Sequence, residues 1–369
     1  MPPHLTLQES RELLSLCNSG KLKQVEDWIH AGRSITVHPK SRDNPLNAVL
    51  RKGYFSLLEL LAQHCESQEC LNEVTLQAVR RQKFDFVRVL VENGADPHAV
   101  PFSDAVCAWD PEMLRYFINK GCDIFANDAL ARALTYCIQG ALWFLVDYKR
   151  DHPERMEDLQ YQVDQALAIH CRDGEKKGVA MMMWAGGNPY AKVRDLEREK
   201  NRDKPWHLIS GAYEAARKGN TEILKLLDLD PTHPDAQDLL EVACCGIHVS
   251  AVSYLLRIGI PPNDKENGGS SGLDTILIHM NWGLRFKRIL PSYSCTASDC
   301  LRIAKALIRH RAKWTPDPHD LRAARRAVCQ VEPRYASELV GLLKRPRVCD
   351  PEILEKFAGT ARMRELLKH

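Results

Sequence analysis

The chain has 369 residues, of which 44% are hydrophobic, 27% charged and 7% aromatic, and its formal net charge is +3. No window of 18 residues is uniformly apolar, so no membrane-spanning helix and no membrane partner are predicted. The amino-terminal residues, MPPHLTLQESRELL, lack the basic and then apolar segments of a secretory signal. The composition therefore predicts a cytoplasmic protein.

A short amphipathic segment recurs along the chain. It reads VRVLVENGAD at 87–96, LRYFINKGCD at 114–123, VAMMMWAGGN at 179–188, VSYLLRIGIP at 252–261 and IAKALIRHRAK at 303–313. The spacing of the apolar residues predicts a helix in each segment, and all but the last end at or near a glycine that can stop a helix. One such helix cannot bury its apolar face alone. The recurrence therefore predicts a stack of helices that share one core.

Residues 44–61, NPLNAVLRKGYFSLLELL, show how two helices form a pair. Pro45 can open the first helix, because the first helical position has no use for an N–H group. Gly53 ends this helix, and the leucines that follow form the apolar stripe of the second helix. Residues 100–123 and 211–227 are organised in the same way, with Pro101 and Gly219 at corresponding places.

This pattern resembles the ankyrin repeat, whose consensus runs TPLHLAA, two variable residues, glycine, a linking stretch and VVKLLLEAGAD. The matching residues are Pro45, Leu46, Gly53, Leu57, Leu60 and Leu61 in the first copy quoted and Pro101, Gly121 and Asp123 in the second. The resemblance covers nearly the whole chain as about ten degenerate copies. Their second helices are expected to start near residues 21, 56, 85, 112, 141, 177, 222, 250, 300 and 338.

The resemblance implies an all-α, ankyrin-like solenoid of stacked helix–turn–helix repeats that acts as a non-enzymatic scaffold or adaptor for protein–protein interaction. Only four residues separate Asp96 from Pro101, so the β-hairpin fingers of the family are expected to be shortened. We expect one elongated solenoid over residues 1–369. Its parts are an N-terminal capping repeat at 1–43, repeats at 44–190, a charged insertion at 191–204, repeats at 205–350 with long loops at 261–272 and 283–296, and a C-terminal cap at 351–369. The charged insertion is interpreted as a solvated helix extension or a loop.

The sequence has no convincing catalytic or metal signature. GGSSG at 268–272 has the spacing of a hydrolase nucleophile motif, but no strand precedes it, so a flexible loop is expected. The thirteen cysteines include no CxxC, and Cys65/Cys70 and Cys295/Cys300 lack the tight pairing of a zinc site. Without a secretory signal, disulfides are not expected. We therefore expect no enzyme activity, no cofactor and no metal.

In ankyrin-like stacks, the two variable residues before the mid-repeat glycine point into the concave groove. The resemblance carries this position onto Arg51–Lys52, Arg80–Arg81, Arg172–Asp173, Arg217–Lys218 and Arg325–Arg326. Gln82 replaces the glycine that would follow Arg81. Four of the five pairs are doubly basic, and stacking would place them in a row that suits an acidic segment of a protein partner. The alternative is that these cations only complement the dipole at helix carboxyl ends.

The carboxyl-terminal part is the more basic. Residues 281–369 contain 19 Lys and Arg against 9 Asp and Glu, a balance of +10 in a chain of net charge +3, so the rest carries about −7. Arg285, Lys287 and Arg288 stand beside Phe286 and Tyr293, a mixture that single-strand binders use. Nucleic-acid or anionic-ligand binding is therefore the alternative function. The predicted partner-binding residues are Arg51, Lys52, Arg80, Arg81, Arg217, Lys218, Arg325, Arg326, Arg285 and Arg288. Trp184 is interpreted either as an exposed contact or as a side chain that a neighbouring loop covers.

Overall fold

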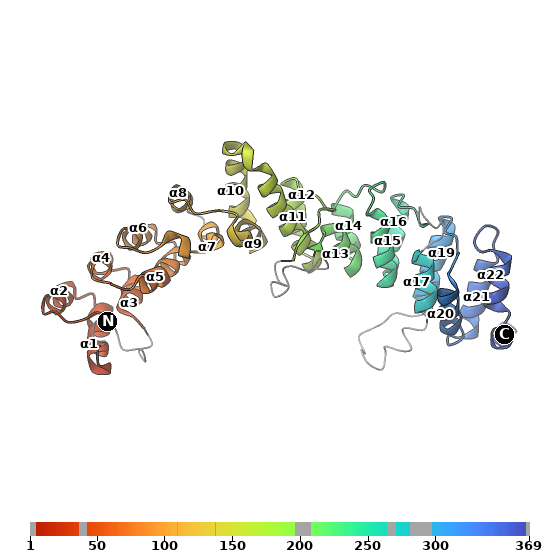
Figure 1. Cartoon of the computed structure of the whole chain (residues 1–369), viewed down its shortest axis with the longest axis horizontal. Coiled ribbons are helices and arrows are strands. Elements are labelled where there is room, and N and C mark those ends of the chain that lie inside the picture. Colours follow the sequence, from red (N-terminus) through yellow and green to blue (C-terminus); the bar gives the residue numbers. More distant parts are fainter. Residues whose placement is uncertain are drawn as a thin grey trace. The chain divides into compact units, whose positions relative to one another are not determined.

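The computed structural model describes residues 5–36, 43–108, 110–136, 138–195, 208–263, 271–280 and 297–366. The chain divides into two compact units, Met1–Gln162 and Val163–His369. In each unit, short helices follow one another in pairs that are joined by tight turns (Figure 1). No helix in the described ranges is both long enough and apolar enough to cross a bilayer.

The first unit is built from two layers of helices. Its helices are α1 (Leu7–Asn18), α2 (Leu22–His30), α3 (Pro45–Lys52), α4 (Phe55–Gln63), α5 (Gln68–Arg80), α6 (Phe84–Glu92), α7 (Phe102–Cys107), α8 (Pro111–Asn119), α9 (Ala129–Tyr136) and α10 (Ile138–Asp151). Short 3₁₀ turns lie at η1 (Pro97–Ala99), η2 (Ala126–Asp128) and η3 (Pro153–Arg155). The first helices of successive pairs pack in the series α1, α3, α5, α7 and α9, while α2, α4 and α6 pack in the second layer.

The second unit repeats this organisation. Its elements are α11 (Met156–Asp173), which contains the boundary between the units, α12 (Lys176–Trp184), β1 (Val193–Arg194), β2 (Leu208–Ile209), α13 (Gly211–Lys218), α14 (Thr221–Leu226), α15 (Ala236–Cys245), α16 (Val249–Arg257), α17 (Ser271–His279), α19 (Ala297–Arg309), α20 (Pro318–Val328), α21 (Pro333–Leu343), α22 (Pro351–Ala358) and α23 (Ala361–Leu366). The first layer runs α13, α15, α17, α20 and α22. The second layer runs α12, α14, α16, α19, α21 and α23.

The predicted all-α, ankyrin-like stack of helix–turn–helix pairs is confirmed. Each helix of the two layers named above contacts its pair mate or the helix of the next pair in its own layer, so the apolar face of one pair is covered by its neighbours. The connection from α6 to α7 is a 3₁₀ turn, η1, in place of a long hairpin finger. In the described ranges, strands are limited to β1 and β2, which have two residues each.

The pair α3–α4 shows why these residues fold as they do. Asn44 caps α3, because its Oδ1 accepts a hydrogen bond of 2.7 Å from the main-chain N–H of Asn47. Pro45 occupies the first turn, and Gly53 stops the helix with φ at 78°. Leu58 and Leu61 of α4 are 0% exposed. Local stop signals therefore set the bounds of the helices, and shared burial holds the pair in the stack.

Gly53 and Gly219 offer a matched test of this turn, since both follow a first helix in the left-handed conformation, at φ 78° and 67°. A Cβ atom on Gly53 would meet no atom within 4 Å, whereas on Gly219 it would lie 2.3 Å from the ring of His248. Gly53→Ala is therefore expected to cost about 1 kcal/mol of unfolding free energy, from backbone strain alone. Gly219→Ala should cost about 2 kcal/mol more, because the ring must move. Urea unfolding followed by circular dichroism measures both losses, and equal losses would contradict this account.

The structure adds a strand pair beside one insertion and corrects the boundary of another. β1 lies near the start of the predicted charged insertion at 191–204 and pairs antiparallel with β2, which follows the insertion, with Val193 opposite Ile209. Residues 196–207 lie outside the described ranges. Ser271 and Gly272 belong to the first turn of α17, and Gly272 is buried, so the predicted loop at 261–272 ends earlier. The predicted loop at 283–296 lies outside the described residues.

Candidate partner-binding surface

Four of the predicted cations stand at the carboxyl ends of α3 and α5, two helices that pack against each other. Arg51 and Lys52 are the last residues of α3, Arg80 is the last residue of α5, and Arg81 follows it. All four side chains are exposed. We call these four residues the basic cluster.

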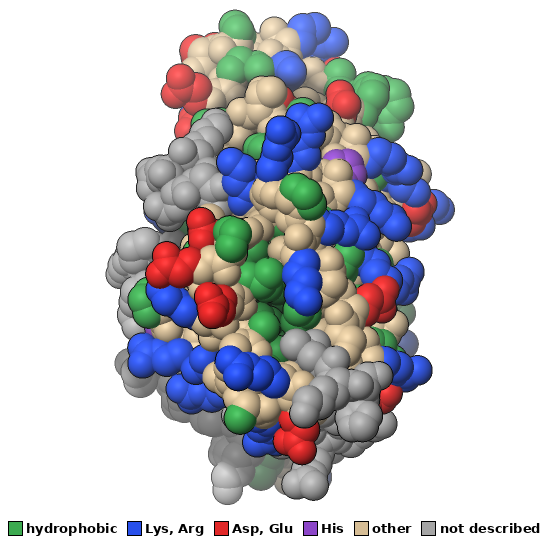
Figure 2. All heavy atoms as spheres, turned by 90° about the vertical axis from the view of Figure 1, so that its right-hand side faces the viewer, with side chains coloured by type: hydrophobic (Ala, Val, Ile, Leu, Met, Phe, Trp, Pro, Cys, Tyr) green, Lys and Arg blue, Asp and Glu red, His purple; other side chains and the backbone are tan. Residues whose placement is uncertain are grey.

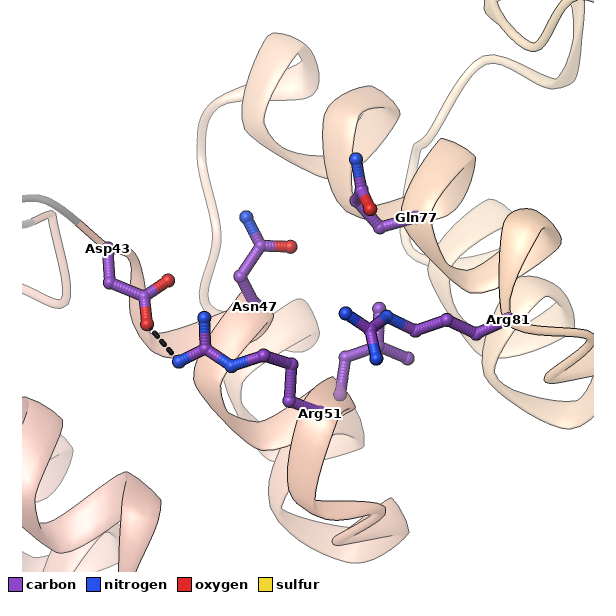
Figure 3. Close-up of a pocket in the computed structure, with 6 residues that line it drawn as sticks. Asp43, Asn47, Arg51, Gln77 and Arg81 are labelled. Carbon is purple, nitrogen blue, oxygen red and sulfur yellow. Dashed lines mark hydrogen bonds and ion pairs between the residues drawn. The ribbon is translucent and has the colours of Figure 1, made fainter.

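A small pocket of about 180 Å³ is lined by Arg51 and Arg81, two of the four residues of the basic cluster. Its lining residues are Asp43, Asn47, Leu50, Arg51, Gln77 and Arg81. In Figure 3, Arg81 extends from α5 toward α3, while Arg51 extends toward Asp43. Asn47 and Gln77 each lie four residues before an arginine, so each helix presents an amide and a guanidinium on one face. Sequence reasoning missed the two amides, although the spacing of four could have revealed them.

Carboxylates balance only part of this charge. Arg51 forms an ion pair with Asp43, and Arg80 Nε lies 2.8 Å from Oδ1 of Asp104, a residue of α7. The hydrogen bond and the charge of Asp104 raise the pKa of Arg80. Within the described residues, Lys52 and Arg81 have no carboxylate partner. Of the four cations in the basic cluster, two are therefore paired with a carboxylate of the described residues and two are not.

The predicted cations of the second unit do not form a comparable cluster. Arg217 Nη2 lies 2.5 Å from Oε2 of Glu214, and this hydrogen bond raises the pKa of Arg217. Arg325 donates a hydrogen bond of 3.2 Å to the carbonyl oxygen of Lys356. Lys218 and Arg326 are exposed. In the first layer, however, α15 and α17 separate α13 from α20, so the two basic pairs lie on helices that are not neighbours.

The remaining basic residues do not extend the row. The side chain of Arg172 is only 12% exposed, because it pairs with Asp173 at 3.0 Å and with the buried Asp195 at 2.8 Å. Arg285 and Arg288 lie outside the described residues, as does the basic–aromatic segment around them. Figure 2, which faces the right-hand side of Figure 1, shows lysine and arginine side chains spread over this face with acidic and apolar side chains between them.

A larger and more apolar cleft, of about 370 Å³, lies between α8 and α10. Its lining includes Leu114 and Ile118 from α8 and Trp143 and Phe144 from α10. Trp143 is 72% exposed at its rim. The ring centroids of Phe144 and Phe102 lie 5.9 Å apart, so a residue that lines the cleft packs against α7. Trp184, at the end of α12, is also 72% exposed, so the interpretation in which a loop covers it is wrong.

One group of side chains in the described ranges has ligand atoms close enough together to suggest a metal. Asp317, His319 and Asp320 lie at the start of α20, with ligand atoms within 4.8 Å of one another. Asp317 Oδ1 already accepts hydrogen bonds of 2.7 Å from the main-chain N–H groups of His319 and Asp320. These bonds cap the helix and hold the pKa of Asp317 below its usual value. Capping therefore accounts for this grouping.

No protein-family model and no curated protein matches the chain. A comparison with solved structures finds the human ASB11 ankyrin repeat domain, which aligns over 83% of this chain and 99% of its own length. The sequence identity is 14% and the TM-score is 0.26. At this TM-score the likeness supports no inference about partner or site. The helix contacts of the chain itself define its fold as a stack of helical pairs.

Proposed function

We propose that the protein is a non-enzymatic scaffold that binds an acidic segment of a protein partner at the basic cluster. The observation that carries this proposal is that Arg51, Lys52, Arg80 and Arg81 stand at the carboxyl ends of two packed helices, where the described residues supply Asp43 and Asp104 as their paired carboxylates. A cytoplasmic location for this activity stays a prediction from the sequence.

The chemistry of the pocket supports an anionic side chain. Arginine and the amide groups of Asn47 and Gln77 are hydrogen-bond donors, and a planar guanidinium can donate two parallel bonds to one carboxylate. Neighbouring helices lie about 8–10 Å apart. An extended chain advances about 3.3 Å per residue, so acidic residues about three apart would match α3 and α5. Stabilisation of the helix dipole explains why the cations stand at helix ends. It does not explain why the basic cluster has two more cations than paired carboxylates in the described residues.

The test uses the full chain and a fluorescent peptide in which every third residue is glutamate and the others are small and polar. The double variant Lys52→Glu/Arg81→Glu reverses the two cations that have no carboxylate partner among the described residues. An exposed charge contact is worth about 0.2–1 kcal/mol, and reversal adds repulsion, so the Kd of the peptide should rise about tenfold or more. Fluorescence anisotropy measures this Kd, and raised salt should weaken wild-type binding.

The matched control is Lys23→Glu/Arg88→Glu, which changes the net charge equally at exposed positions on α2 and α6. It should leave the Kd within about twofold of wild type. Equal losses in the two double variants would refute a defined site. A labelled single-stranded oligonucleotide tests the alternative function. Tighter binding of the oligonucleotide than of the peptide, with a steep salt dependence, would favour nucleic acid and overturn the proposal.

A further inference from the structure

The pocket beside the basic cluster offers more hydrogen-bond donors than one carboxylate can use. Its donors are the side chains of Asn47, Arg51, Gln77 and Arg81. Of these four side chains, Arg51 alone forms a hydrogen bond within the described residues, to Asp43. A carboxylate has two oxygens, and one planar guanidinium can donate to both of them. A single carboxylate would therefore leave most of these donors unused.

The donors stand on two packed helices around one space. Asn47 and Arg51 belong to α3. Gln77 belongs to α5, and in Figure 3 Arg81 extends from the end of this helix toward α3. Leu50 also lines the pocket and is only 2% exposed, so one wall of the pocket belongs to the hydrophobic core. Such a wall lowers the local dielectric and strengthens hydrogen bonds to an anion.

The charge of the basic cluster also exceeds what one carboxylate balances. Its four cations have two paired carboxylates among the described residues, Asp43 and Asp104, which leaves two positive charges. A phosphate monoester carries a charge of about −1.5 to −2 at pH 7 and has three strong acceptor oxygens. One water takes up about 30 Å³ of the liquid, so a pocket of about 180 Å³ has room for a phosphate group. Charge and donor number therefore favour phosphate over carboxylate, and the volume admits it.

We propose that the pocket binds the phosphate group of a phosphoserine in the acidic segment of the partner, an inference that rests on the proposed function. The phosphate oxygens accept hydrogen bonds from both arginines and both amides of the pocket. Paired guanidinium groups bind phosphate through parallel hydrogen bonds, as arginine clusters do in phosphopeptide recognition. Phosphorylation of the partner therefore strengthens its binding, and removal of the phosphate weakens it.

Asp43 is the one carboxylate of the described residues that lines the pocket, and it pairs with Arg51. Its charge repels any anion that enters. Both this repulsion and the attraction of the cations scale with the charge of the ligand. Because the cations are in excess, a dianion gains about twice the net attraction of a single carboxylate. Removal of the Asp43 charge should therefore tighten the binding of a phosphoserine segment.

The test compares three fluorescent peptides that differ only at their central residue, which is phosphoserine, glutamate or serine. With the full chain, the Kd from anisotropy should be lowest for phosphoserine, about fivefold or more below that for glutamate. The serine peptide should bind most weakly. Equal Kd values for phosphoserine and glutamate, both raised by Lys52→Glu/Arg81→Glu, would overturn the phosphate inference and leave the proposed function standing. Absence of binding by all three peptides would overturn both.

Two variants test the pocket itself, and circular dichroism shows whether each is folded. Asn47→Ala/Gln77→Ala removes two donors without changing the charge, so it should raise the Kd of the phosphoserine peptide about tenfold. Asp43→Asn should lower this Kd about threefold. The matched control Asp27→Asn removes the same charge from an exposed position on α2 and should leave the Kd nearly unchanged. Equal effects of the two aspartate variants would refute the site.

The pH dependence distinguishes phosphate from carboxylate. Phosphoserine gains a proton with a pKa of about 6, whereas glutamate stays charged down to about its pKa of 4.3. The advantage of the phosphoserine peptide over the glutamate peptide should therefore shrink from pH 7 to pH 5, and an unchanged advantage would contradict phosphate binding. The charged groups of the lining are Asp43, Arg51 and Arg81, and no histidine of the described residues joins them. Protonation of Asp43 would remove a repulsion, so it cannot produce this loss.

Competition separates a phosphoserine segment from nucleic acid. An unlabelled single-stranded oligonucleotide with hydroxyl ends contains only phosphodiesters, each with a single negative charge. At equal phosphate concentration it should displace the fluorescent phosphoserine peptide less well than the unlabelled phosphoserine peptide does. Better displacement by the oligonucleotide, with a steep salt dependence, would overturn the proposal.

Discussion

Trp314→Ala is expected to lower the unfolding free energy of the second unit by about 4 kcal/mol, because removing a buried tryptophan loses both its transfer energy and its packing. The side chain is 0% exposed. Its ring meets that of Phe357 edge to face at 5.0 Å, and its Nε1 donates a hydrogen bond of 2.8 Å to Asp274. One residue in the connection between α19 and α20 therefore contacts both α17 and α22. Urea unfolding monitored by circular dichroism measures the loss.

Two further variants divide this loss into its parts. Trp314→Phe keeps an aromatic ring but removes the donor to Asp274, so it should cost about 1–3 kcal/mol. Trp184→Ala removes a tryptophan of the same unit that is 72% exposed, and it should change the unfolding free energy by less than about 0.5 kcal/mol. A loss for Trp314→Ala no larger than that for Trp184→Ala would show that the stack does not depend on this contact.

Asp195→Ala should cost about 3 kcal/mol, because it leaves the guanidinium of Arg172 in a buried position without its closer carboxylate. The side chains of Asp195 and Arg172 are 4% and 12% exposed, and their atoms Oδ1 and Nη1 lie 2.8 Å apart. The same unfolding experiment measures this loss. Because the pair is buried, 1 M NaCl should change the loss little.

Asp173→Ala is the matched control for this pair. Asp173 also contacts Arg172, at 3.0 Å, but its side chain is 44% exposed. Its removal should cost less than about 1 kcal/mol, and salt should reduce the cost further. If both variants lost the same free energy, burial would not distinguish the two contacts.

The order and type of the helices could be read from local signals, and this explains where the sequence prediction succeeded. Second helices were expected near residues 56, 85 and 222, and α4, α6 and α14 begin at Phe55, Phe84 and Thr221. One second helix was expected to start near residue 338, but α21 begins five residues earlier, at Pro333. A proline can occupy the first helical position, so this start was recoverable from the sequence.

The candidate site was predictable only in part, because the identity of a counterion depends on tertiary packing. The sequence placed Arg51, Lys52 and Arg80 at helix ends, and the structure has them there. It could not show that Asp104 of α7 pairs with Arg80, which lies 24 residues earlier. Nor could the sequence show that Asp195 pairs with Arg172. Asp195 follows α12 and β1 in the chain, and only the fold brings it back to Arg172 at the end of α11.

The pairing of β1 with β2 has a consequence for engineering. Val193 and Ile209 are neighbours across an antiparallel ladder, so the two ends of the intervening segment are fixed about one strand spacing, about 4.8 Å, apart. Gln165 of α11 holds β1 in place by donating a hydrogen bond of 3.1 Å to the carbonyl oxygen of Arg194. A foreign peptide grafted between these anchors would face a closure entropy that grows by only about 0.6 kcal/mol for each doubling of its length.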